Sequence, residues 1–463
     1  MTKVIDFMRG DRLRSFYLGN YYPIFVVAVC FLSHITSLEW LFCSIILITA
    51  FYGILMFDSV VPLITPACCL SLHIARVNSA VDPSSSDFYF SGSGLFVSIP
   101  LITIIVASTV AFFVLRYKRG KLDLKKAPLL LPSLLLALAL LLNGVFSDGY
   151  TVKNLAIGAF EVLTIFFFFY VFALGLSGED RSTLVDRFCF ITALIALLLA
   201  LEIGWLYLTN EALFISGSIY KPQIVFGWGV SNTAGSMLCV LIPVCFLGVM
   251  RMKHAWFYLF AGTLAFGSIF LTLSRNSVLV SILTYAVCCV LAMIFGNYKK
   301  AMRIILPIMA LVALLLIVVL WDKIEVVFRD YFNKGLSDSG RFSIWDSAIP
   351  SFLSAPLFGV GFFGVSYAPE MTAFIPGMLH CTPFQVVASM GLFGILSYGY
   401  YRVMTVIKAL RRPTLVKTML SAAMLVILVG SLLDNFIFYM QQMIYPSIAL
   451  ALVYVVDENE EKL

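Results

Sequence analysis

Three side chains in the second half of the sequence belong to types that bind anions and move protons. Arg275 lies in LTLSRNSVLV, inside an almost uninterrupted apolar run from Ala255 to Gly296, and Arg341 and His380 follow further along the chain. An arginine guanidinium group forms paired hydrogen bonds to oxyanions. An unperturbed histidine has a pKa of about 6.5, so it can accept a proton near neutral pH. These three residues can act together only if the elements that carry them bring their side chains to one place.

The composition indicates that those elements lie in a membrane. Of the 463 residues, 61% are hydrophobic and only 12% are charged, and the mean hydropathy is +0.99. These values lie far outside the range of soluble globular domains. Apolar stretches of about 20 residues, the length that crosses a bilayer as a helix, recur along the whole chain. We therefore predict an all-α polytopic membrane protein.

Fourteen apolar segments are candidates for transmembrane helices. They are residues 21–36, 39–57, 60–76, 95–115, 127–145, 154–176, 188–208, 229–250, 255–273, 276–296, 303–321, 384–401, 418–434 and 438–456. The third segment is short and contains two prolines, but it is needed to keep the basic stretch RYKRGKLDLKK on the cytoplasmic side. We expect about 14 spans, within a range of 12 to 14. No small-residue cleavage site follows the first segment, which predicts a retained helix and not a signal peptide.

The positions of lysine and arginine predict the orientation of these helices. Placing the N-terminus inside leaves most of the 31 basic residues on the cytoplasmic side, as basic loops require. The tail at 457–463 is then cytoplasmic as well. We divide the chain into N-terminal transmembrane helices, 1–208, and a core at 209–456. The core is expected to contain one large extracytoplasmic loop, 322–383, with short helices in it.

Several polar residues reach the outer face in this topology. Arg275 lies in a tight outer turn between two helices, His380 ends the outer loop, and Asp434 closes an outward-going helix. Lys221 lies in a short outer loop, and Asn232 begins the helix that follows it. With Arg341, these residues can converge at one boundary between water and membrane. Arg275 alone also has a simpler interpretation, because arginines at helix ends often extend to the lipid headgroups.

The order of motifs resembles the core of the O-antigen ligase and polymerase superfamily, which includes capsular and exopolysaccharide polymerases. The motifs are TLSR, SGRFSIWDSAI, APLFGVGFFG and LHCTPFQVVASMGLFGIL, and the resemblance covers roughly residues 220 to 440. In that family a helix-terminal Ser-Arg precedes a large outer loop. The loop holds an Arg-x-x-x-Trp segment and a Pro-x-x-Gly-x-Gly turn, and it ends in a histidine followed by a helix.

The resemblance implies a glycosyltransferase of the bacterial plasma membrane that needs no cofactor and no metal. Its donor is a saccharide on a polyprenyl diphosphate at the outer leaflet, and its acceptor is a hydroxyl of a second sugar. Transfer inverts the anomeric centre. Arg275 and Arg341 then bind the diphosphate, Lys221 assists them, and His380 is the general base. The sequence contains no P-loop and no D-x-D spacing, so it offers no site for a nucleotide sugar. No nucleic acid is expected as a partner. Association with other polysaccharide-assembly proteins is compatible with this role.

The remaining candidate residues keep two interpretations each. Asp434 pairs with an arginine or orients His380, or else it caps a helix or lies exposed. Asn232 binds substrate, or it is a polar group at a helix N-terminus with no catalytic part. Trp345 stacks on a sugar ring or anchors the loop at the membrane interface.

Two positions depart from the family pattern. The family commonly has His-Asn where this chain has His380-Cys381, and arginine where this chain has Lys221. The first departure leaves the partner that orients the histidine open. The second replaces a bidentate donor by a point charge.

Three functions stay open at this stage. A polymerase joins one lipid-linked unit to another, whereas a ligase transfers the finished glycan to an anchor such as lipid A core. Ligases usually have twelve helices. The extra N-terminal helices expected in this chain favour a polymerase. A flippase or other transporter of lipid-linked sugars is the alternative of another class, which the intramembrane Glu161 suits. Against a transporter, the chain has no repeated halves.

Overall fold

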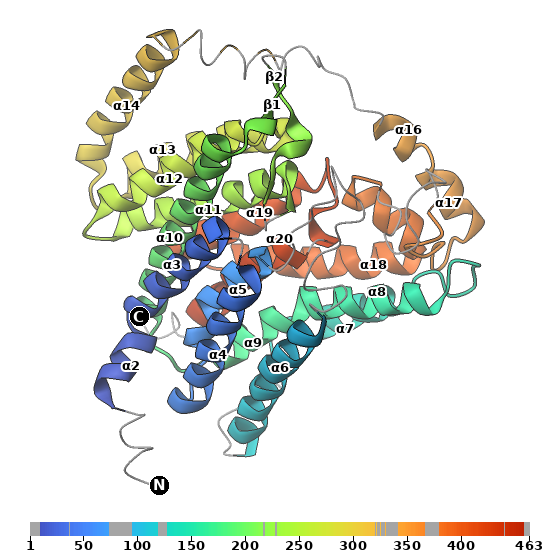
Figure 1. Ribbon diagram of the computed structural model, residues 1–463. Coiled ribbons are helices and arrows are strands. Elements are labelled where there is room, and N and C mark those ends of the chain that lie inside the picture. Colours follow the sequence, from blue (N-terminus) through green and yellow to red (C-terminus); the bar gives the residue numbers. More distant parts are fainter. Residues whose placement is uncertain are drawn as a thin grey trace. The chain divides into compact units, whose positions relative to one another are not determined.

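The computed structural model describes twelve parts of the chain, shown in Figure 1. They are residues 10–36, 38–73, 95–118, 127–215, 218–226, 229–319, 321, 325, 329, 341–365, 379–438 and 440–457. Helices dominate these parts, and the four strands have two residues each. The predicted all-α class is therefore confirmed. Residues 330–340 and 366–378 of the predicted outer loop lie outside the described residues.

Among the described residues, five helices are long and apolar enough to cross a membrane, or six if the bent pair formed by 11–18 and 21–36 counts as one span. Five shorter apolar helices of 10 to 17 residues accompany them. The chain is thus built for a membrane. The predicted number of 12 to 14 spans and the outer position of the loop at 322–383 stay predictions.

The described chain forms two compact units that do not follow the order of the sequence. The first unit contains the described residues from 10 to 118 and from 174 to 329, and the second contains those from 127 to 173 and from 341 to 457.

The helices of the first unit agree with most predicted segments. They are α2 (Asp11–Leu18), α3 (Tyr21–Thr36), α4 (Glu39–Phe57), α5 (Val61–His73), α6 (Leu95–Lys118), α10 (Arg181–Thr209), α11 (Ser231–Arg251), α12 (Ala255–Leu271), α13 (Arg275–Phe295) and α14 (Lys299–Val319). Helix α10 begins seven residues before the predicted start at 188, because Asp180 accepts a hydrogen bond from the Thr183 backbone and caps it. Before α11 the chain forms β1 (Phe214–Ile215), β2 (Ser218–Ile219), the 3-10 turn η5 (Lys221–Gln223), β3 (Val225–Phe226) and β4 (Gly229–Val230).

Helix α11 is the buried centre of the first unit. In the most apolar 18-residue stretch of this helix, 94% of the residues are buried inside the protein. Helices α10, α12 and α13 pack around it. Small residues permit this close packing. A Cβ on Gly235 would lie 2.7 Å from the Ser277 hydroxyl and 2.9 Å from the Thr272 hydroxyl. The start of α11 is therefore adjacent to the turn between α12 and α13.

The second unit contains the remaining helices. They are α7 (Leu130–Leu142), α8 (Val152–Val162), the π-helical turn η3 (Leu163–Phe167), α9 (Phe168–Gly175), α16 (Arg341–Trp345), α17 (Ala348–Ser354), α18 (Thr382–Leu410), α19 (Leu415–Gly430), the 3-10 turn η6 (Phe436–Phe438) and α20 (Met440–Asp457). The last two residues of α9 belong to the first unit. Short helices are thus present in the loop 322–383, as expected.

One helical boundary differs from the prediction in a way that matters for the site. Helix α19 ends at Gly430, so Asp434 does not close a helix. It lies in the turn between α19 and η6, because Ser431 caps the helix and its carbonyl accepts a hydrogen bond from the backbone of Thr382.

Glu161, near the end of α8, is 5% exposed. Its carboxyl group accepts a hydrogen bond of 3.4 Å from the Thr164 hydroxyl in the adjoining π-helical turn η3.

Helix α18 is broken at Gly391, inside the segment predicted as one continuous span. Gly391 has φ 60° and ψ −156°, a conformation that only glycine adopts readily. The backbone groups released by the break pair with the loop after α17. Leu392 N–H donates to Pro356 O at 2.8 Å, and Val360 N–H donates to Ala388 O at 3.0 Å. Irregular backbone in a membrane is tolerated where protein satisfies it in this way.

The break gives a prediction for stability. Gly391→Ala should lower the free energy of unfolding by at least about 1–3 kcal/mol, because of the backbone conformation. The added Cβ would also lie 2.5 Å from the Gly359 backbone nitrogen. Gly399→Ala is the matched control: it lies in the same helix, and its Cβ would meet nothing within 4 Å. Thermal unfolding in detergent should show a lower midpoint for the first variant only. Equal midpoints would contradict the break.

Candidate functional site

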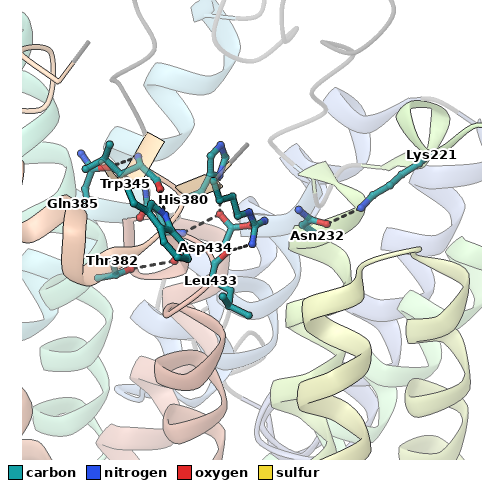
Figure 2. Close-up of polar contacts among 11 residues, drawn as sticks. Lys221, Asn232, Trp345, His380, Thr382, Gln385, Leu433 and Asp434 are labelled. Atoms are coloured by element: carbon teal, nitrogen blue, oxygen red, sulfur yellow. Dashed lines mark hydrogen bonds and ion pairs between the residues drawn. The ribbon is translucent and has the colours of Figure 1, made fainter. Parts of the chain in front are cut away.

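The second unit brings Arg341 and His380 to the carboxylate of Asp434, and Figure 2 shows His380 beside Asp434. Asp434 Oδ1 lies 3.2 Å from His380 Nδ1, and Asp434 Oδ2 lies 3.8 Å from the Arg341 guanidinium. Arg341 also donates to the Leu433 backbone carbonyl. The Asp434 side chain is only 6% exposed, whereas those of Arg341 and His380 are 23% and 38% exposed. The carboxylate therefore forms the base of the site, and the cation and the imidazole lie above it at the surface of the unit.

The hydrogen-bonding capacity of these groups assigns the tautomer of His380. A carboxylate only accepts hydrogen bonds, so the ring hydrogen lies on Nδ1 and Nε2 is the basic nitrogen. Asp434 thus contacts both His380 and Arg341. It does not lie exposed at a helix end, which was the other alternative.

Local structure fixes the backbone on both sides of His380. His380 itself has φ 49°, a left-handed conformation that is uncommon outside glycine. Leu379 N–H donates to the Gln385 side chain at 2.8 Å, and Leu379 O accepts from the Trp345 indole N–H at 2.8 Å. Cys381 follows as the N-cap residue of α18. The imidazole thus begins from a constrained backbone and not from a free loop end.

Gln385 connects the two segments that carry the histidine and the aspartate. Its Oε1 accepts from Leu379 N–H at 2.8 Å and from the Asn435 side-chain amide at 3.0 Å. Its amide nitrogen donates to the Ser389 hydroxyl at 2.7 Å, and the residue is fully buried. Sequence reasoning missed Gln385. The available signal was a glutamine within an otherwise apolar helix, in FQVVAS.

Trp345 is held by protein at its ring and at its N–H. Its ring lies 5.4 Å from that of Phe384 and 5.3 Å from that of Phe342, measured between centroids. Together with the bond to Leu379 O, these contacts attach α16 to the start of α18. Trp345 thereby holds Arg341, at the other end of the same five-residue helix, next to the histidine segment.

The glycine turn at 359–361 is fixed by the turn between α7 and α8. Phe362 N–H donates to Asn154 Oδ1 at 2.7 Å and to Asn143 Oδ1 at 3.2 Å, and both asparagines are fully buried. Gly359 and Gly361 have φ of 71° and 81°. A Cβ on Gly361 would lie 2.9 Å from Asn154 Oδ1. The turn is therefore a docking point for α7 and α8, which the G-x-G pattern did not indicate.

The first unit holds the other candidate residues. Lys221 Nζ donates to Asn232 Oδ1 at 3.0 Å (Figure 2). Asn232 is the second residue of α11, and Arg275 is the first residue of α13 after a turn in which Leu273 has φ 53°. Since the start of α11 lies next to that turn, the two cations occupy the same end of the unit. Their convergence with His380 on one substrate stays a prediction.

The environment of Cys381 differs from that of a reactive thiol. Burial raises the pKa of this thiol, although Arg341 lowers it in part. A raised pKa keeps sulfur protonated and weakly nucleophilic. Within the described residues, no three histidine, cysteine or acidic side chains are grouped to hold a metal ion.

Comparison with known proteins supports the resemblance of the motifs. Residues 260–399 match the model of a family described as O-Antigen ligase. This range includes Arg275, Arg341, Trp345 and His380, whereas Lys221, Asn232 and Asp434 lie outside it. No curated protein gave a significant match to the chain.

Proposed function

Since residues 260–399 match the O-antigen ligase family and support membership of the O-antigen ligase and polymerase superfamily, we propose that the chain is a glycosyltransferase on the outer face of the plasma membrane. It polymerises saccharide units that are carried on polyprenyl diphosphate. The observation that carries this proposal is the contact of Asp434 with both His380 and Arg341. The Asp434 carboxylate thereby orients a base, His380, and a cation, Arg341. In this proposal these are the two groups that the transfer needs.

The imidazole acts on the acceptor sugar. Nε2 of His380 takes the proton from the acceptor hydroxyl as its oxygen attacks the anomeric carbon of the donor. Asp434, bound to Nδ1, holds the ring in the required tautomer and stabilises the imidazolium that forms. The new bond joins the acceptor oxygen to the anomeric carbon, and the bond from that carbon to the diphosphate oxygen breaks. Attack opposite the leaving group inverts the anomeric centre.

The cations act on the leaving group. As the sugar departs, negative charge accumulates on the diphosphate, and a fixed guanidinium stabilises it without reorganising. Arg341 is fixed by Leu433 O and Asp434. That Arg275 and Lys221 also act on the diphosphate stays a prediction from the sequence. Asn232 orients the Lys221 ammonium group through the bond of 3.0 Å.

Ligase activity is the second candidate, because the matched family is described by that name. The same chemistry serves both activities, and only the acceptor differs. The flippase alternative relied on Glu161 as an intramembrane acid. Its contact with Thr164 in the same helix gives that carboxyl group a structural partner, which weakens the alternative.

Deletion of the gene distinguishes these functions. Surface glycan is separated on gels, and the glycan on the carrier lipid is analysed by mass spectrometry. For a polymerase we expect loss of long chains while single units stay attached to their anchor. Unattached long chains on the carrier would indicate a ligase. Accumulation of carrier-linked units on the inner leaflet would overturn the transferase and favour a flippase.

Gln385 provides a prediction about positioning. Gln385→Leu should lower the rate constant of transfer at least tenfold with little change in KM for the donor, because Leu379 N–H and the Asn435 amide lose their shared acceptor. Gln385→Glu keeps that acceptor and should retain most activity. Rates are measured per folded molecule, as determined by size-exclusion chromatography. A leucine variant with the normal rate constant would contradict the role.

A further inference from the structure

A cavity of about 400 Å³ lies in the first unit between the ends of α2, α4 and α6. Its walls include the apolar side chains of Leu55, Phe57, Phe112 and Leu115, and its polar groups are Arg14 and Asp58. Leu55 and Leu115 are 40% and 47% exposed, although they border a hollow of the protein. The transferase mechanism uses none of these residues.

Among the described residues that line this cavity, the charged side chains are Arg14 and Asp58. Arg116 lies beside it and offsets the charge of Asp58, since its Nε lies 3.9 Å from Asp58 Oδ1. The other two guanidinium nitrogens of Arg116 donate to the backbone carbonyls of Gly175 and Asp58, at 3.0 and 3.3 Å. Its guanidinium also stacks over the Phe112 ring at 4.8 Å. Arg14, an exposed residue of α2, is the cation among the described residues that line the cavity.

The helix that carries Arg14 has the features of an interfacial element. It has eight residues and meets α3 at an angle of 62°. Its Tyr17 is buried against Tyr22 and Phe57, with ring centroids 4.8 and 5.4 Å apart, whereas Arg12 and Arg14 are exposed. Such helices lie along the membrane surface with basic side chains toward the headgroups. The orientation predicted from the basic loops puts this end on the cytoplasmic side.

We propose that this cavity binds an anionic phospholipid of the cytoplasmic leaflet. Arg14 binds the phosphodiester, and an acyl chain lies against Leu55 and Leu115. The positive charge of Arg14 suits the negative charge of a lipid such as phosphatidylglycerol. Basic sites between helices on this side are suited to lipid headgroups. The exposed leucines favour a lipid over a water-soluble phosphate, which has no apolar part to cover them.

Titration of the purified full-length protein with phosphatidylglycerol, followed by native mass spectrometry, tests the proposal. Arg14→Gln should weaken binding at least tenfold. Arg12→Gln, on the same helix but not lining the cavity, should change it less than twofold. Leu115→Asn should also weaken binding, whereas Val110→Asn, on an exposed position of α6 away from the cavity, should not.

Three results would overturn the proposal. Equal binding by the Arg14 and Arg12 variants would remove Arg14 from the site. Equal affinity for phosphatidylcholine would show that negative charge is not recognised. Equal affinity for glycerol phosphate would indicate a site for a water-soluble anion. None of these measurements depends on the proposed transferase activity.

Discussion

Replacement of His380 by glutamine should lower the rate constant of glycosyl transfer by roughly 10² to 10⁴ fold, the usual contribution of a general base. Glutamine keeps a polar group that can contact Asp434 but has no basic nitrogen for the acceptor proton. Donor binding should change little, because in the proposed mechanism the imidazole contacts the acceptor and not the diphosphate. Initial rates with a lipid-linked donor, and donor binding measured separately, give the two quantities.

The matched control for this variant is His254→Gln. His254 is an exposed histidine that precedes α12 in the first unit, so its replacement should leave the rate unchanged. A His380→Gln protein that folds and transfers at the normal rate would exclude the histidine as the base. Loss of donor binding without loss of the rate constant would assign it to substrate binding instead.

Replacement of Arg341 should have the second-largest effect. Arg341→Gln removes the positive charge that we propose for the leaving group and should lower the rate constant by roughly 10² to 10³ fold. Arg341→Lys should fall between this variant and the native protein, because a point charge retains the attraction to phosphate but loses the bidentate geometry. Single-turnover rates at saturating donor measure the effect directly.

Arg329→Gln is the control for the arginine series. Arg329 is an exposed arginine of the same predicted outer loop, and no described contact connects it with Asp434. It should transfer at the normal rate. If Arg341→Gln and Arg329→Gln lower the rate equally, the loop acts through its total charge, and the contact between Arg341 and Asp434 has no special role.

The sequence was informative where a local pattern determines the structure. Apolar runs predict the helices α11 to α14 closely, because a bilayer requires continuous apolar helices of defined length. Arg275 is the first residue of α13, as the hairpin interpretation required. The contacts of Asp434 with His380 and Arg341 agree with one of the alternatives left open for that residue.

Features that depend on contacts between distant segments could not be predicted in this way. Gly391 lies in a segment that reads as continuous helix, and only the loop after α17 explains its break. Gln385 looks like one polar residue in an apolar helix until Leu379 and Asn435 are placed beside it. Asp434 was assigned to a helix end because the apolar run continues past Gly430. Apolar composition does not reveal where a helix stops.

The most direct measurement is a reaction of the purified full-length protein with saccharide units linked to polyprenyl diphosphate, with no nucleotide sugar present. The acceptor is either a second lipid-linked unit or a separate lipid anchor. We predict that one polyprenyl diphosphate is released for each glycosidic bond formed, as measured by mass spectrometry of both products. Transfer that requires a nucleotide sugar, or movement of the lipid-linked units across vesicles without bond formation, would contradict the account.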